Sequence, residues 1–221
     1  VALLLPAERR FVRSEGLLAS GRQMLAHFRN PQLVATFAVG FGVLFIFICT
    51  FTYMSFHLAA PPYNLSATWL GAIFVVYLVG AFLTPWIGWA AARFGRRRFV
   101  VRVIGLWVGG ITLTLASPLW AIIAGLAICA GCGLICQAMS TGYVTITAKA
   151  GRSSAVGLYV TSFYVGGSFG AAIGGLAWNI GGWPACVALV AAMLAIMALI
   201  VLLVWAPGVP GTPAPAPIEL A

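Results

Sequence analysis

Three cysteines and one serine in this sequence have the spacing of chemical sites, but their surroundings argue against such chemistry. Cys129, Cys132 and Cys136 follow the pattern C-x-x-C-x-x-x-C, which puts three thiols on one face of a helix. A metal site would need a fourth ligand and a reason to hold thiolates in an apolar run. Gly166-Gly167-Ser168-Phe169-Gly170 matches the G-x-S-x-G pattern of a nucleophile elbow. It lies inside an apolar run, with no carboxylate nearby to orient a histidine. We therefore expect no metal, no cofactor and no catalytic residue.

Polar side chains inside the long apolar runs are better candidates for a site, because such groups cost free energy in lipid unless they face protein or water. Gln137, Thr141 and Thr145 recur every four residues, so they form one polar stripe along a helix. Tyr53 shares a helix face with Cys49 in the first apolar run. Two interpretations stay open for these residues: hydrogen bonds between helices, or contacts with a bound solute.

Membrane-spanning α-helices are the elements that must position these side chains. Of the 221 residues, 62% are hydrophobic and 7% are charged, whereas a soluble domain carries about 25% charged residues. No carboxylate side chain lies between Gly16 and Ile218, and a bilayer is the solvent that tolerates such a stretch. Strands of a membrane barrel alternate apolar and polar residues, but these runs are apolar throughout. We predict an all-α polytopic membrane protein, built as a bundle of six transmembrane helices.

Six segments are long and apolar enough, or nearly so, to cross the roughly 30 Å core of a bilayer. Within a bundle over residues 31–206, their ranges are about 33–56, 69–92, 99–116, 119–148, 155–178 and 184–206. Gly and Pro separate several of them, as at Ser117-Pro118 and Gly181-Gly182. Residues 1–30 are predicted to form a basic cytoplasmic loop, and residues 207–221 a disordered, Pro-rich cytoplasmic tail.

The Lys and Arg residues, twelve in all, fall on one side of this six-span path. The N-terminal segment holds five, the loop after the second span with the start of the third holds five, and the loop after the fourth holds two. The loops after the first, third and fifth spans hold none. The positive-inside rule places the basic side, with both ends of this segment, in the cytoplasm. The net charge of +9 thus indicates topology, and we expect no binding of nucleic acid.

The junction between the second and third spans carries the most specific motif. The stretch Gly88-Trp89-Ala90-Ala91-Ala92-Arg93-Phe94-Gly95-Arg96-Arg97 resembles the G-x-x-x-D-R-x-G-R-R signature of the major facilitator superfamily. That signature lies between the second and third helices of the superfamily and, more loosely, between the eighth and ninth. The matching residues are Gly88, Arg93, Gly95, Arg96 and Arg97. Ala92 stands where the family has Asp. A positive-inside anchor with a Gly turn is a second, compatible interpretation.

This resemblance implies that the chain is the C-terminal six-helix half of a twelve-helix secondary transporter, with an N-terminal six-helix half as its missing partner. Residues 1–30 are then the loop between the halves. By resemblance, the function is to move a small-molecule substrate across the lipid bilayer by alternating access. The closest branches are the drug/proton antiporters and sugar-efflux-like permeases, so we expect efflux driven by proton exchange in a bacterial cytoplasmic (inner) membrane.

The resemblance also selects candidate site residues. The superfamily lines its central cavity with the helices that correspond to the first and fourth spans here, which makes Tyr53, Gln137 and Thr141 the candidates for substrate contact. A stand-alone six-span permease or channel subunit that acts as a dimer is the alternative function. A membrane enzyme would need clustered His, Asp or Glu side chains at membrane depth, and the sequence has none.

Glycines in the fifth span predict a close helix contact. Gly166, Gly170 and Gly174 repeat every four residues and form a small-xxx-small face that lets a helix backbone approach its neighbour. In the superfamily, the corresponding helix packs against the other bundle and slides during alternating access. Static packing is the other interpretation.

Overall fold

The structure, a computed structural model, describes residues 21, 24–148 and 150–206. The predicted Pro-rich tail and most of the predicted basic loop lie outside these residues. From Pro31 onward the described chain is helical apart from short connections, and it contains no strand. Its elements are α2 (Pro31–Ala59), α3 (Ala67–Ile73), the 3-10 helix η1 (Phe74–Val76), α4 (Tyr77–Phe94), α5 (Arg96–Leu113), α6 (Leu119–Thr147) and α7 (Arg152–Val204).

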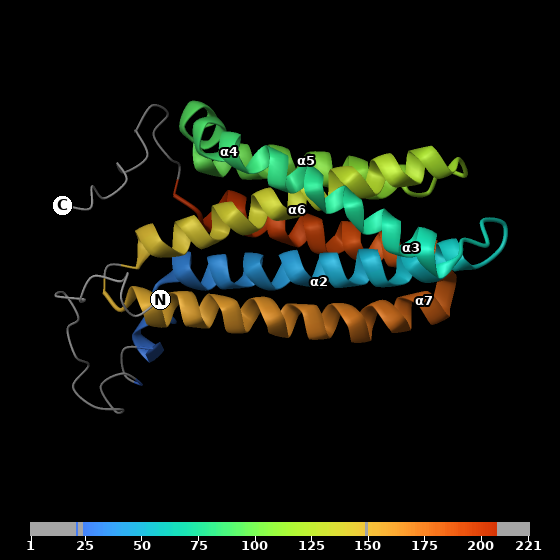
Figure 1. The fold of residues 1–221 in the computed structure, drawn as a ribbon. Helices are drawn as coiled ribbons and strands as arrows, with labels where there is room; N and C mark the ends of the chain where they lie inside the picture. Colours follow the sequence, from blue (N-terminus) through green and yellow to red (C-terminus); the bar gives the residue numbers. More distant parts are fainter. Residues whose placement is uncertain (1–20, 22–23, 149, 207–221) are drawn as a thin grey trace, which may run out of the picture.

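The long helix α7 consists of two arms that run in opposite directions (Figure 1). The backbone leaves helical geometry at Gly181 (φ −152°, ψ 21°) and Gly182 (φ 61°, ψ −147°). The second of these conformations is open to glycine and strained for other residues. The sequence predicted a break here between the fifth and sixth segments, and the glycine pair provides it.

Among the described residues, three helices are long and apolar enough to cross a membrane: α2, α6 and α7. The segments Ala67–Gly80 and Pro85–Phe94, bent by 52° relative to each other, qualify together as a fourth. Pro85 lies at this bend, where a proline removes a backbone hydrogen bond and kinks a helix. With the two arms of α7 and with α5, these helices occupy the ranges of the six predicted segments. The predicted all-α membrane bundle is confirmed, while the crossing of each segment remains a prediction.

Local chemistry explains several helix boundaries. The Asn30 side chain caps α2 by accepting a hydrogen bond from the Gln32 backbone N–H at 3.0 Å, and Pro31 occupies the first turn. Gly95, with φ 76°, separates α4 from α5. Gly151, with φ 58°, precedes α7. Each glycine adopts a backbone that side-chain-bearing residues avoid, so the chain turns between antiparallel helices at these points.

The helices lie side by side and roughly antiparallel, with α2 between α6 and the first arm of α7 (Figure 1). The α4–α5 junction, the start of α2 and the start of α7 therefore lie at one end of the bundle (Figure 1). We call it the basic end, because the arginines of the described residues lie there or just before α2. These are Arg29, Arg93, Arg96, Arg97, Arg98, Arg102 and Arg152. The described residues include no Asp or Glu.

Close packing of α2 against α7 depends on the predicted glycine face. A Cβ atom on Gly166 would overlap the main chain of Phe41, and one on Gly170 would overlap the main chain of Phe45. At Gly174 the space is taken by the Tyr53 ring. The three glycines thus lie against α2 of this same chain, where they bring two helix backbones into direct contact.

Candidate functional site

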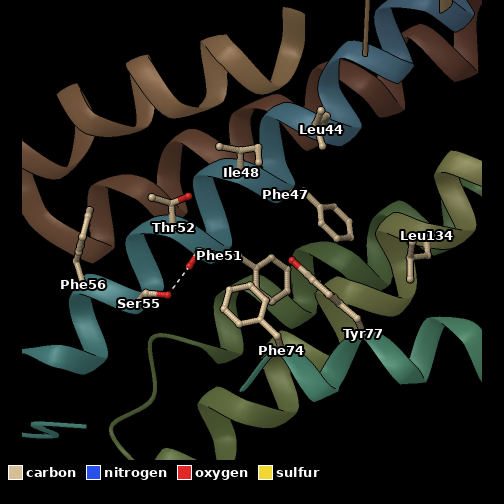
Figure 2. A pocket seen from close by; sticks show the side chains of 10 residues that line it. All are labelled: Leu44, Phe47, Ile48, Phe51, Thr52, Ser55, Phe56, Phe74, Tyr77 and Leu134. Atoms are coloured by element: carbon tan, nitrogen blue, oxygen red, sulfur yellow. Dashed lines mark hydrogen bonds between the residues drawn. The ribbon is translucent and has the colours of Figure 1, made fainter. Parts of the chain in front are cut away.

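A pocket of about 520 Å³ lies between α2, the η1–α4 segment and α6 (Figure 2). Seven of its lining residues come from α2, two from the η1–α4 segment and one from α6. They are Leu44, Phe47, Ile48, Phe51, Thr52, Ser55, Phe56, Phe74, Tyr77 and Leu134. A volume of this size lies in the range of pockets that hold small organic ligands.

Four aromatic rings form a continuous group in this pocket. The Tyr77 ring centroid lies 4.7 Å from that of Phe51, 5.6 Å from that of Phe74 and 5.7 Å from that of Phe47. Phe51 and Phe74 are 6.0 Å apart. Aromatic pairs attract each other at such separations, preferentially edge to face or offset. Phe47 also lies against Gly133 of α6, which leaves room for its ring. These contacts hold α2, α4 and α6 together around the pocket.

Hydroxyl groups are the polar side-chain atoms of the pocket, and they belong to Thr52, Ser55 and Tyr77. Ser55 Oγ donates a hydrogen bond of 2.8 Å to the carbonyl oxygen of Phe51 one turn earlier (Figure 2). Within the described part of the chain, the hydroxyls of Thr52 and Tyr77 make no hydrogen bond. Figure 2 shows the Tyr77 hydroxyl pointing toward α2 among the aromatic rings. None of the ten lining side chains carries a charge at neutral pH.

The three predicted contact residues do not line this pocket. Tyr53 is 8% exposed and lies on the side of α2 that faces α7. Its hydroxyl donates to the carbonyl oxygen of Ala171, and its ring stacks on Trp178 at 6.1 Å. The geometry of Tyr53 is therefore that of a hydrogen bond between helices, one of the two interpretations that the sequence left open.

The predicted polar stripe of α6 is half-buried to exposed. Thr141 Oγ1 donates to the Gln137 carbonyl oxygen at 2.9 Å, and Thr145 Oγ1 donates to the Gly142 carbonyl oxygen at 2.9 Å. These threonines thus bond to the backbone of their own helix. The Gln137 side chain makes no hydrogen bond to a described residue. Contact of Gln137 and Thr141 with a solute remains a prediction.

A signal for the pocket was present in the sequence of the first span. Leu44, Phe47, Phe51 and Ser55 follow one another at three- or four-residue spacing, which places them on one helix face. Tyr77 had no comparable signal, because it belongs to a different helix, α4, and only the tertiary structure brings it beside this face of α2.

The signature loop lies at the basic end between α4 and α5. Gly95 supplies the turn, while Gly88 is exposed and has open space beside it. Arg93 is exposed and Arg97 half-buried. The guanidinium carbon of Arg96 lies 5.7 Å from the centroid of the Tyr143 ring, a cation–π contact. In the described residues, Arg96 thus rests on an aromatic ring of α6 rather than on a carboxylate.

Tyr143 connects four segments at the basic end. Its hydroxyl donates to Gln32 Oε1 at 3.3 Å and accepts from the backbone N–H of Ala206 at 3.2 Å. Its ring stacks on Trp205 with centroids 4.3 Å apart and an interplanar angle of 13°.

Partial burial lowers the pKa of Arg96, although the nearby Tyr143 acts in the opposite direction. Because an arginine guanidinium is not deprotonated in proteins near neutral pH, Arg96 stays charged there.

No group of three or more His, Cys, Asp or Glu side chains that could hold a metal ion occurs among the described residues. Cys129, Cys132 and Cys136 are buried and unpaired on α6. Their arrangement is that of packing residues in an apolar helix contact.

The chain is similar to one protein family and to several proteins that are named as transporters. Residues 33–220 match the model of the Major Facilitator Superfamily. The uncharacterized MFS-type transporter YybF of Bacillus subtilis is 29% identical over 187 residues, which cover 84% of this chain and 46% of YybF. The inner membrane transport protein YnfM of Escherichia coli is 29% identical over 164 residues, 74% of this chain and 39% of YnfM.

A third relative, an uncharacterized transporter of Buchnera aphidicola from Schizaphis graminum, is 28% identical over 152 residues. The match covers 69% of this chain and 37% of the relative. The chain therefore spans less than half the length of the curated relatives it matches.

Proposed function

Because this chain belongs to the major facilitator superfamily, we propose that it forms the C-terminal six-helix half of a secondary transporter that moves a small solute across a membrane by alternating access. The observation that carries the proposal is the family match over residues 33–220, together with relatives of which the matched part is less than half. The family and the relatives' names indicate a transporter rather than an enzyme.

In this proposal, the pocket between α2, α4 and α6 is this half's part of the solute pathway, and the other half encloses the solute from the opposite side. The signature motif follows the second span of this bundle, where both halves of the family carry it. Its looser match, with Ala92 in place of Asp, supports the assignment to the C-terminal half. Gln137 and Thr141 remain proposed contacts on the same helix, α6, that supplies Leu134 to the pocket.

We further propose efflux driven by proton exchange, in a bacterial inner membrane with the basic end in the cytoplasm. The bacterial relatives, one of them named an inner membrane transport protein, support this location. The segregation of the arginines to one end supports the orientation. Since the described residues include no carboxylate, the proton-coupling group is expected in the other half of the protein.

The experiment that tests the proposal starts from the native gene. We expect the reading frame to continue upstream of Val1 through six further apolar segments. The purified full-length product in proteoliposomes is expected to move a solute when a pH gradient is imposed, whereas residues 1–221 alone move none. Transport by residues 1–221 alone would instead support the alternative, a six-span permease that acts as a dimer.

A further inference from the structure

We propose that the pocket between α2, α4 and α6 binds an uncharged aromatic solute, with its ring against Phe51 and Tyr77 and its polar group hydrogen-bonded to the Tyr77 hydroxyl. This inference rests on the proposed function, because it names the class of solute that the transporter carries.

Because the pocket lining carries no charge, we expect the pocket to bind uncharged solutes more tightly than charged ones. None of the ten lining side chains is ionised at neutral pH. The arginines of the described residues lie at the basic end or just before α2, whereas the pocket residues of α2 run from its middle, at Leu44, toward its other end, at Phe56. A charged solute would lose its water in this pocket and gain no opposite charge from the lining, which is costly in an apolar medium.

The ring arrangement selects an aromatic solute. Tyr77 already makes edge contacts with Phe51 at 4.7 Å and with Phe74 at 5.6 Å. Both phenylalanines and Tyr77 contribute to the pocket surface. A flat solute ring extends the same network of edge and face contacts, and each such pair adds attraction beyond the burial of apolar area.

The Tyr77 hydroxyl selects a solute that carries one hydrogen-bonding group. This hydroxyl points toward α2 and makes no hydrogen bond within the described part of the chain (Figure 2). A polar group left unpaired in an apolar surrounding costs free energy. An acyl chain of a lipid offers no partner to it, whereas a hydroxyl, amide or ether on a solute does. The volume of about 520 Å³ suits a solute of two or three rings better than a whole lipid.

Equilibrium dialysis of the purified full-length protein in detergent tests this inference with four bicyclic probes of similar size. The neutral aromatic probe is 2-naphthol, and its saturated counterpart is decahydro-2-naphthol. The anionic probe is naphthalene-2-sulfonate and the cationic probe is 2-naphthylmethylammonium. We expect saturable binding of 2-naphthol, with the other three at least tenfold weaker.

Variants locate the binding in the pocket. Tyr77→Phe removes only the hydroxyl and is expected to weaken 2-naphthol binding about threefold to tenfold, the worth of one hydrogen bond. Phe51→Ala is expected to weaken it at least tenfold through lost ring contact. Phe82→Ala, which truncates a 74% exposed ring of α4 outside the pocket, is the matched control for Phe51→Ala. Tyr164→Phe, on α7, is the matched control for Tyr77→Phe, and both controls should bind like the wild type.

The outcomes separate this inference from the proposed function. The inference would be overturned if the charged or saturated probes bind as tightly as 2-naphthol, or if 2-naphthol does not bind. It would also be overturned if Tyr77→Phe binds 2-naphthol like the wild type. Transport of a charged solute or a sugar at an unchanged rate by Tyr77→Phe would also overturn it, and would leave the transporter proposal standing. Binding of 2-naphthol in the pocket by a full-length protein that moves no solute would overturn the transporter proposal, and would leave the pocket as a binding site for an uncharged aromatic molecule.

Discussion

At the scale of single residues, the α2–α7 contact depends on the absence of side chains. Gly166 and Gly170 let main chain meet main chain, and Gly174 receives the ring of Tyr53. The repeat of small residues was evident in the sequence, but its partner was not. By resemblance we expected these glycines to pack against the other bundle, whereas the structure places α2 of this chain against all three of them.

Gly170→Ala is expected to destabilise the protein by about 1–3 kcal/mol, because its Cβ would meet the main chain of Phe45, which cannot rotate away. The measurement is thermal unfolding of the purified protein in detergent. Gly157→Ala in the same helix is the control, since no atom lies within 4 Å of its Cβ. There, alanine's higher helix propensity predicts unchanged or slightly raised stability. Equal effects at the two positions would contradict the packing argument.

Tyr53→Phe separates the two interpretations of that residue. Its hydroxyl already bonds the Ala171 carbonyl, so we expect a stability loss of about 1 kcal/mol and an unchanged KM for the transported solute. A raised KM with unchanged stability would instead assign Tyr53 to substrate contact. Thermal unfolding and proteoliposome transport on the same preparation make the comparison.

At the scale of elements, the basic end is organised around one aromatic residue. Arg96 at the start of α5 stacks on Tyr143 of α6, which also contacts Gln32 of α2 and Ala206 after α7. The family signature has a carboxylate where this chain has Ala92. The Tyr143 ring gives Arg96 a neutral partner at this end of the bundle, so the junction of α4 and α5 is held without an ion pair among the described residues.

Two substitutions of Tyr143 test this arrangement. Tyr143→Phe removes the two hydrogen bonds but keeps the ring, so we expect a loss of about 1–2 kcal/mol. Tyr143→Leu also removes the stacking on Trp205 and Arg96 and is expected to cost a further kcal/mol or so. Thermal unfolding in detergent gives both values. If the Leu variant is no less stable than the Phe variant, the ring contacts contribute nothing.

At the scale of the whole molecule, the described arginines lie at or just before one end of an antiparallel bundle, while the α2–α3 loop, the α5–α6 loop and the turn of α7 form the other. Aromatic side chains and backbone groups join the segments of that other end. Tyr63 donates to the Ser117 carbonyl at 2.6 Å, and Trp183 Nε1 lies 3.2 Å from the Thr114 carbonyl oxygen. Charge at one end and neutral loops at the other suit a fixed orientation in a membrane.

Cysteine labelling tests this orientation. Ser66→Cys lies before α3 at the neutral end and Ser153→Cys at the start of α7 at the basic end, and both serines are exposed. The five native cysteines are buried and contribute little background. In intact cells, a membrane-impermeant maleimide should label only Ser66→Cys, with Ser153→Cys labelled after lysis. The reverse pattern would place the basic end outside.

The sequence by itself determined that this protein lies in a lipid bilayer, where its helical segments and their main breaks are, and to which family it belongs. A membrane-spanning helix must be apolar along its whole length, so its composition alone reveals it. Breaks such as Gly181-Gly182 and Gly95 are also evident in the sequence, because glycine adopts backbone conformations that other residues avoid. Only the tertiary structure decided which face of each helix meets which neighbour. In lipid both the packed face and the outer face of a helix are apolar, so periodicity does not separate them. For this reason periodicity could not decide between the two interpretations of Tyr53, which lies against α7, while Phe51 and Tyr77 line the pocket.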